Sequence, residues 1–258
     1  MIETAFLGVP GVNAWIFFGL SVAACCTSIV AMVTGTAGGL LLLAIMAFFF
    51  EPTTLLPLHT IIMLLTSVHV AILFWRYTLK ATVLPFLGGS IAGAALGGQI
   101  FIALPAAILQ GIIGIFIFIL ILTWLPKIAS AGGETKRFAV VGFGVTFLGI
   151  FVSATGSLLA SFVASASPDR RNHVATMGAL MICSHVTKIV AFGVLGIALS
   201  AYVPLIIAMV AGAATGNWIG GQMLDRMQEQ IFRTLFKVLL TILGLRLLWV
   251  GARGLGWF

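Results

Sequence analysis

The sequence predicts an all-α polytopic membrane protein made of two inverted repeats, each a broken or re-entrant helical hairpin followed by three transmembrane helices. Three observations predict this fold: an excess of apolar residues, apolar runs of membrane-spanning length, and an internal duplication. Of the 258 residues, 61% are hydrophobic and 7% are charged, with a mean hydropathy of +1.23. Soluble domains average about 45–50% apolar and about 25% charged residues. No water-soluble core of this size can absorb that excess, so the bilayer must solvate much of the chain.

Apolar runs separated by short polar segments follow one another along the chain. They cover residues 12–50, 55–75, 81–103, 106–125, 138–166, 174–199, 203–224 and 232–250. Most are close to the ~20 residues that a spanning helix needs. As a single helix, run 12–50 would be about 58 Å long, nearly twice the ~30 Å hydrocarbon core. It must therefore turn back, and Gly35, Gly38 and Gly39 mark the break.

The doubled-back first run decides how the halves are oriented. Run 12–50 begins and ends on one side and three crossings follow, so the first half contains an odd number of crossings. If run 138–166 also turns back, the second half enters from the opposite face. We therefore expect one integral membrane domain, with inverted repeats at 1–126 and 138–258 joined by a cytoplasmic linker, 127–137.

The charged residues agree with this topology. In this topology, one side of the membrane carries only Arg253 and the acidic Glu3 and Glu51. The other side carries most of the basic residues, namely Arg76, Lys80, Lys127, Lys136, Arg137, Arg170, Arg171, Arg226 and Arg233. Cytoplasmic loops of membrane proteins are enriched in Lys and Arg. We therefore expect a multi-pass protein of the cell inner membrane with both termini outside the cytoplasm, and we expect no nucleic-acid partner despite the +7 net charge.

Self-similarity supports the duplication. The pattern GxxxGxxxGGQ occurs at 89–99 and again at 212–222, a constant offset of 123 (212 − 89). Small residues at this spacing let helix backbones approach closely in lipid, so we expect both stripes to lie at helix–helix contacts. Earlier in each half, residues 33–36 align with 152–155 at an offset of 119 (152 − 33).

These motifs resemble the TauE/SafE family of sulfite and organosulfonate exporters, also called toluene sulfonate uptake permeases. The resemblance is carried by Thr-Gly-Thr-Ala-Gly-Gly-Leu-Leu-Leu at 34–42, by Pro52, by the stripe ending at Gly97-Gly98, and by a degenerate second copy at 147–157. It covers essentially the whole chain. It implies transport of an anion, often a sulfur-containing acid, and a homodimer. The second copy keeps one glycine, Gly156, and the substrate within the family stays open.

The two helix breaks are the predicted substrate site. Broken helices of inverted repeats commonly place the substrate at the membrane midplane. A helix that restarts there exposes unpaired N–H groups and a positive dipole end, which suit an oxyanion. The predicted binding residues at the breaks are Thr34, Gly35, Thr36, Gly38, Gly39, Ser153, Thr155, Gly156 and Ser157. The alternative is a packed hairpin whose Ser and Thr side chains only cap the backbone.

Lys188 is predicted to supply positive charge. It lies well inside run 174–199, where an ionisable side chain is costly and usually faces a cavity or a partner. His185 lies one turn earlier on the same helix face. At the offset of 119, His69 matches Lys188, so the site also includes His69. The alternative for Lys188 is snorkelling or pairing with backbone carbonyls, and His59 is interpreted as an interfacial histidine at the outer end of its helix.

Acidic residues are missing from the middle of the runs. All six Asp and Glu residues fall at segment ends or in loops, which argues against a cation carrier or a carboxylate proton relay. Catalytic and nucleotide-binding motifs are absent as well, and we expect no enzyme activity, metal or cofactor. The resulting hypothesis is an exporter of sulfite, sulfoacetate or another organosulfonate working by alternating access. An intramembrane enzyme or cofactor-binding subunit using His59, His69 and His185 is one alternative, and an anion channel is another.

Overall fold

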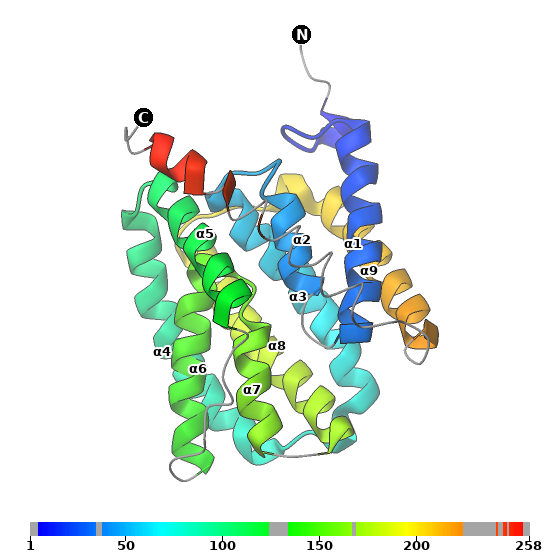
Figure 1. Cartoon of the computed structure of the whole chain (residues 1–258), viewed down its shortest axis with the longest axis vertical. Coiled ribbons are helices and arrows are strands. Elements are labelled where there is room, and N and C mark those ends of the chain that lie inside the picture. Colours follow the sequence, from blue (N-terminus) through cyan, green and yellow to red (C-terminus); the bar gives the residue numbers. More distant parts are fainter. Residues whose placement is uncertain are drawn as a thin grey trace.

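The computed structural model describes residues 5–34, 38–123, 134–166 and 169–223, together with parts of 241–254. All regular structure in these residues is helical, with short 3-10 turns at Phe6–Gly8, Trp75–Tyr77 and Ser200–Tyr202. The helices form a bundle (Figure 1). They are α1 (Ala14–Thr34), α2 (Gly38–Met46), α3 (Pro52–Phe74), α4 (Lys80–Ala103), α5 (Ala106–Thr123), α6 (Glu134–Val152), α7 (Gly156–Ala166), α8 (Arg170–Val194) and α9 (Val203–Met223).

Several of these helices are long and apolar enough to cross a membrane. Among the described residues there are 5 such spans: Ala14–Ala31, Pro52–Ile72, Lys80–Ala103, Arg171–Val194 and Ser200–Gly220. Two shorter apolar helices, Ala106–Phe116 and Gly156–Ala166, accompany them. The chain is therefore a multi-pass membrane protein.

Both doubled-back runs contain a broken helix. The helix α1 is followed by the nine-residue α2, and α6 is followed by the eleven-residue α7. At 1.5 Å per residue, α2 and α7 are about 14 and 17 Å long, roughly half of a ~30 Å hydrocarbon core. Neither short helix crosses a bilayer, so each is the half-length arm of a hairpin. The predicted linker 127–137 overlaps α6, which begins at Glu134, and residues 124–133 lie outside the described part.

The glycine stripes bring helices of the two halves into backbone contact. The helix α4 packs mainly on α6, and α1 packs mainly on α9. A Cβ at Gly89 on α4 would overlap the carbonyl oxygen of Ala139 on α6, and a Cβ at Gly216 on α9 would overlap that of Cys25 on α1. The expected close packing of these stripes is thus confirmed, and each stripe faces the first helix of the other half.

Basic residues gather at one end of the bundle. The Arg171 guanidinium at the start of α8 donates to the Tyr77 hydroxyl after α3, over 3.3 Å. Beside them, the Leu79 amide donates to Thr176 Oγ1 over 3.0 Å, next to the exposed Lys80. The opposite end carries Glu51, the start of α1 and the last described helical residues, 248–254 (Figure 1). Arg76–Lys80 and Arg171 therefore share one end, as the charge argument requires.

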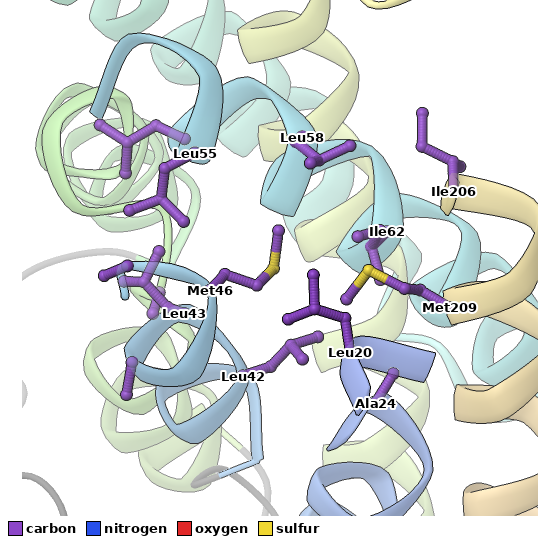
Figure 2. Packing of buried hydrophobic residues seen from close by; sticks show 14 of the residues in the cluster. Leu20, Ala24, Leu42, Leu43, Met46, Leu55, Leu58, Ile62, Ile206 and Met209 are labelled. Carbon is purple, nitrogen blue, oxygen red and sulfur yellow. The ribbon is translucent and has the colours of Figure 1, made fainter. Parts of the chain in front are cut away.

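The arm α2 lies inside the bundle. Figure 2 shows Leu42 and Met46 of α2 beside Leu20 of α1, with Ile62 of α3 and Met209 of α9 closing the cluster. All five side chains are buried. This packing fixes the positions of the first residues of α2 and of the start of α3. Both segments contact the second half of the chain.

Candidate functional site

The break between α6 and α7 is a tight turn around Ser153. This serine has φ of 61°, in the left-handed region that residues with a side chain rarely adopt. Its amide donates to the Gly149 carbonyl over 2.8 Å, and the Ala154 amide donates to the Val152 carbonyl over 2.8 Å. Such a conformation costs about 1–3 kcal/mol and persists only where its surroundings hold it.

Two neighbouring residues of α3 hold the Ser153 side chain. Its Oγ lies 2.8 Å from His59 Nδ1 and 3.0 Å from Thr60 Oγ1. The Thr60 hydroxyl is also 2.7 Å from the Leu56 carbonyl. His59, Thr60 and Ser153 are each 0% exposed, so these bonds form away from solvent.

The same histidine reaches the other hairpin. His59 Nε2 lies 2.9 Å from the carbonyl oxygen of Gly39, at the start of α2. A carbonyl only accepts, so Nε2 carries a hydrogen and donates it. The neighbouring Gly38 leaves no room for a side chain, because its Cβ would overlap the Thr27 carbonyl oxygen on α1. One imidazole thereby connects the first hairpin to the break in the second.

Lys188 points its ammonium at this break. The side chain is 0% exposed, and Nζ donates to the Ser153 carbonyl over 3.4 Å, longer than the usual ~2.9 Å. A Cβ at Gly149 would lie 3.2 Å from Lys188 Nζ and 3.3 Å from Thr155 Oγ1, so both groups flank the same place on α6. In the described residues no carboxylate pairs with Lys188. A buried charge without a partner is costly, which makes this a place where an anion is favoured.

Three other buried polar atoms at the break or on α8 have no partner among the described residues. Thr155 Oγ1, Ser157 Oγ and His185 Nδ1 are buried, and none has a hydrogen-bond partner among the described residues. His185 is 1% exposed and lies one turn before Lys188 on α8. Buried polar groups are normally hydrogen-bonded, so these are groups left available to a ligand. An ammonium, two hydroxyls and an imidazole match the acceptor oxygens of a small oxyanion.

Most predicted residues of the second half meet here. Ser153, Thr155, Ser157, His185 and Lys188 all lie at or beside the break, and Gly156 is the first residue of α7. In the first half, Gly39 contributes a carbonyl and Gly38 contributes close packing. Thr34 ends α1, but its side chain, with Gly35 and Thr36, lies outside the described residues.

His69 is not brought to the site. Its side chain is exposed, and it lies ten residues beyond His59, about 15 Å further along α3. Thr66, which matches His185 at the same offset of 119 (185 − 66), donates to the Ile62 carbonyl of its own helix over 2.9 Å. The alignment placed His69 opposite Lys188 in sequence, but the fold places it elsewhere.

Sequence reasoning named His59 but placed it wrongly, and it did not select Thr60. His59 is not interfacial: it lies seven residues inside α3, about 10 Å from the start of that helix, and is fully buried. The sequence did contain a signal for them, because an adjacent His-Thr pair interrupts an apolar run. Lys188 was selected for the same reason, as a polar residue within an apolar run. In the described residues, no group of three or more His, Cys, Asp or Glu is placed to hold a metal ion.

Comparison with known proteins gives a family assignment. Residues 20–247 match the family described as Sulfite exporter TauE/SafE. Comparisons with curated proteins and with solved structures give no match. The match spans nearly the whole chain, including both hairpins, both glycine stripes and the cluster around Lys188. The chain therefore belongs to the TauE/SafE sulfite exporter family of membrane transport proteins.

Proposed function

We propose that the chain is a secondary transporter that exports a small anion, namely sulfite, sulfoacetate or another organosulfonate. The main support for this proposal is the environment of Lys188. This lysine is fully buried, and its one described hydrogen bond is a long contact to the Ser153 carbonyl. An anion beside Lys188 would supply the missing opposite charge. It would also receive hydrogen bonds from groups that have no partner among the described residues.

The proposed binding residues surround the break in the second hairpin. Lys188 supplies charge, Thr155 and Ser157 supply hydroxyl donors, and His185 supplies an imidazole nitrogen. Gly156 begins α7, so its N-terminal amides add the positive end of a helix dipole. Sulfite and sulfonates carry several acceptor oxygens on one centre, which suits donors arriving from two helices. Thr34, Gly35 and Thr36 remain proposed contacts from the first break.

Alternating access between inverted repeats is the proposed mechanism. Its support is the reciprocal packing of the halves, in which α1 lies on α9 while α4 lies on α6, each through a glycine stripe. The helices α3 and α8 pack against each other between these pairs. Smooth glycine contacts allow two bodies to move against one another, and the site lies where α2, α3, α6 and α8 meet.

Orientation and assembly complete the proposal. The end with Arg76, Lys80 and Arg171 faces the cytoplasm, which places both termini outside the inner membrane. The family resemblance supports a homodimer. Accessibility labelling of single cysteines at the two ends tests the orientation, and light scattering of the detergent-solubilised protein tests the dimer.

Anion binding to the purified protein is the first test of function. We expect sulfite, sulfoacetate, methanesulfonate or ethanesulfonate to stabilise the protein and to bind in calorimetry, and Lys188→Ala to weaken binding by about tenfold or more. The matched control is Lys80→Ala, which removes an exposed lysine at the basic end. Binding to Lys188→Ala with the wild-type affinity, or no binding of any anion to the wild type, would contradict the proposal.

Flux across liposomes distinguishes a carrier from a channel. A carrier saturates with substrate and runs faster when the same anion is present on the opposite side. Currents proportional to voltage, without such exchange, would instead show an anion channel.

A further inference from the structure

Four hydrogen-bond contacts form a chain around His59. They join the Gly39 carbonyl to His59 Nε2, His59 Nδ1 to Ser153 Oγ, Ser153 Oγ to Thr60 Oγ1, and Thr60 Oγ1 to the Leu56 carbonyl. Both ends of this chain are carbonyl oxygens, which only accept. Every contact therefore needs one hydrogen from the three side chains between them.

The hydrogens of these side chains can be counted. Each hydroxyl has one hydrogen and a neutral imidazole has one, giving three hydrogens for four contacts. With neutral His59, one contact between buried polar atoms must lack a hydrogen. A second proton on the imidazole supplies the missing hydrogen for the fourth contact. Nε2 then donates to Gly39, Nδ1 donates to Ser153, Ser153 donates to Thr60, and Thr60 donates to Leu56.

Charges around His59 decide when that proton is accepted. The helix α8 presents Lys188 and, one turn earlier, His185, and both interact electrostatically with His59. The helices α2, α5 and α9 contain no titratable side chain. Those of α6, Glu134, Lys136 and Arg137, are in its first turn, about 24 Å along the helix from Ser153. An empty site thus sets the Lys188 ammonium against a second positive charge on His59, and a bound anion removes that repulsion.

We propose that His59 takes up one proton when an anion binds beside Lys188, and releases it when the anion leaves. This inference rests on the proposed anion transport. The proton comes from the solvent and adds to Nδ1, which changes from acceptor to donor toward Ser153. The Ser153 hydroxyl hydrogen then turns from Nδ1 to Thr60 Oγ1, and no other covalent bond is made or broken. Because linkage is reciprocal, a proton on His59 tightens anion binding by the same factor by which the anion favours the proton. The transported unit is then the anion together with a proton.

Proton uptake on binding is directly measurable. Calorimetric titration with methanesulfonate or ethanesulfonate, in buffers of different ionisation enthalpy, gives the number of protons taken up per anion. These strong acids keep one charge across the pH range, so any proton taken up belongs to the protein. We expect about one proton per anion in the wild type and close to none in His59→Gln, whose amide preserves a donor toward Gly39. His185→Gln should weaken anion binding, because His185 is a proposed binding residue, but each bound anion should still take up about one proton. The matched control His173→Gln should keep the wild-type affinity and the wild-type proton uptake.

A second variant tests the hydrogen count itself. Thr60→Val removes two contacts, so a neutral imidazole satisfies the two that remain, and proton uptake should fall below the wild-type value. Anion binding that requires Lys188 but takes up no proton overturns this inference and leaves the proposed function standing. Uptake that persists in His59→Gln, that disappears equally in His185→Gln, or that is unchanged in Thr60→Val also overturns it. If no sulfonate binds at all, both proposals fail.

Discussion

The helices α3 and α8 pack against each other antiparallel, and they differ in which half of the helix carries the buried polar side chains. In α3 the buried polar pair is His59 and Thr60, near its start, whereas in α8 the buried His185 and Lys188 come near its end. The Arg171–Tyr77 contact shows that the start of α8 meets the end of α3. The start of α3 therefore faces the end of α8, and these polar residues converge on Ser153.

This comparison explains why the repeat alignment misled the prediction of His69. Residues that match in inverted repeats are related by a two-fold axis in the membrane plane. Away from that axis, matched positions lie at different depths. Inverted repeats, as proposed for this chain, would therefore separate Lys188 from its match His69. Lys188 and His59 instead both contact Ser153. The match of His59 in the second half is Gly178, at the same offset of 119 (178 − 59). Lys188 and His59 therefore occupy positions that do not match each other in the two halves.

The largest expected effect separates the two buried histidines. His59→Leu leaves the Gly39 carbonyl without this partner, which costs about 1–3 kcal/mol. Ser153 Oγ keeps its contact with Thr60 and loses one hydrogen bond, worth about 0.5–1.5 kcal/mol, so the expected loss is about 1.5–4.5 kcal/mol together. His185→Leu removes no hydrogen bond among the described residues, so its free energy of unfolding should change far less. Thermal and denaturant unfolding in detergent compare the two. Equal losses of unfolding free energy in the two variants would show that the buried histidines of α3 and α8 do not differ in their structural role.

Lys188 should show opposite effects on binding and on stability. Lys188→Met removes a charged hydrogen bond to the anion, worth about 1.5–3 kcal/mol, so the Kd should rise about ten- to hundredfold. It also removes a buried charge that has no ion-pair partner in the part of the chain that the structure describes, so the unliganded variant should be at least as stable as the wild type. Calorimetry and thermal unfolding without ligand measure the two quantities. A marked loss of stability would instead assign Lys188 a structural role.

The contact between α3 and α8 can be tested away from the site. A Cβ at Gly178 on α8 would lie 3.3 Å from the Ala71 amide nitrogen on α3, whereas nothing lies within 4 Å of a Cβ at Gly193 on the same helix. Gly178→Val should destabilise by about 1–3 kcal/mol through overpacking, and Gly193→Val should be nearly neutral. Thermal unfolding of both variants decides this. A neutral Gly178→Val would show that the helices separate easily there.

The smallest effect is expected at His69. Its side chain is exposed and far along α3 from the cluster, so His69→Ala should change the anion Kd less than about twofold, within ordinary surface effects of ±0.5 kcal/mol. Calorimetry with the same sulfonate measures it. A tenfold loss would restore the pairing of His69 with Lys188 that the alignment suggests.

The fold was largely predictable because the bilayer imposes simple rules on sequence. Run lengths, the break near Gly38 and the glycine stripes each reflect one local requirement: spanning the core, turning back, or packing closely. The site was predictable only in part. Lys188 and Ser153 stood out locally, since each departs from its apolar surroundings. His59 was misjudged because its depth depends on where α3 begins, and its partners are distant in sequence.

The sequence by itself determined the membrane environment, the two broken hairpins, the close-packing surfaces and the end of the bundle that carries the basic residues. These follow from composition and periodicity, which act through short stretches of chain. Only the tertiary structure decided which polar residues share one place. That choice depends on the antiparallel contact of α3 with α8 and on the left-handed turn at Ser153, which aims its hydroxyl at His59 and its carbonyl at Lys188. Long-range geometry of this kind leaves no periodic trace in the sequence.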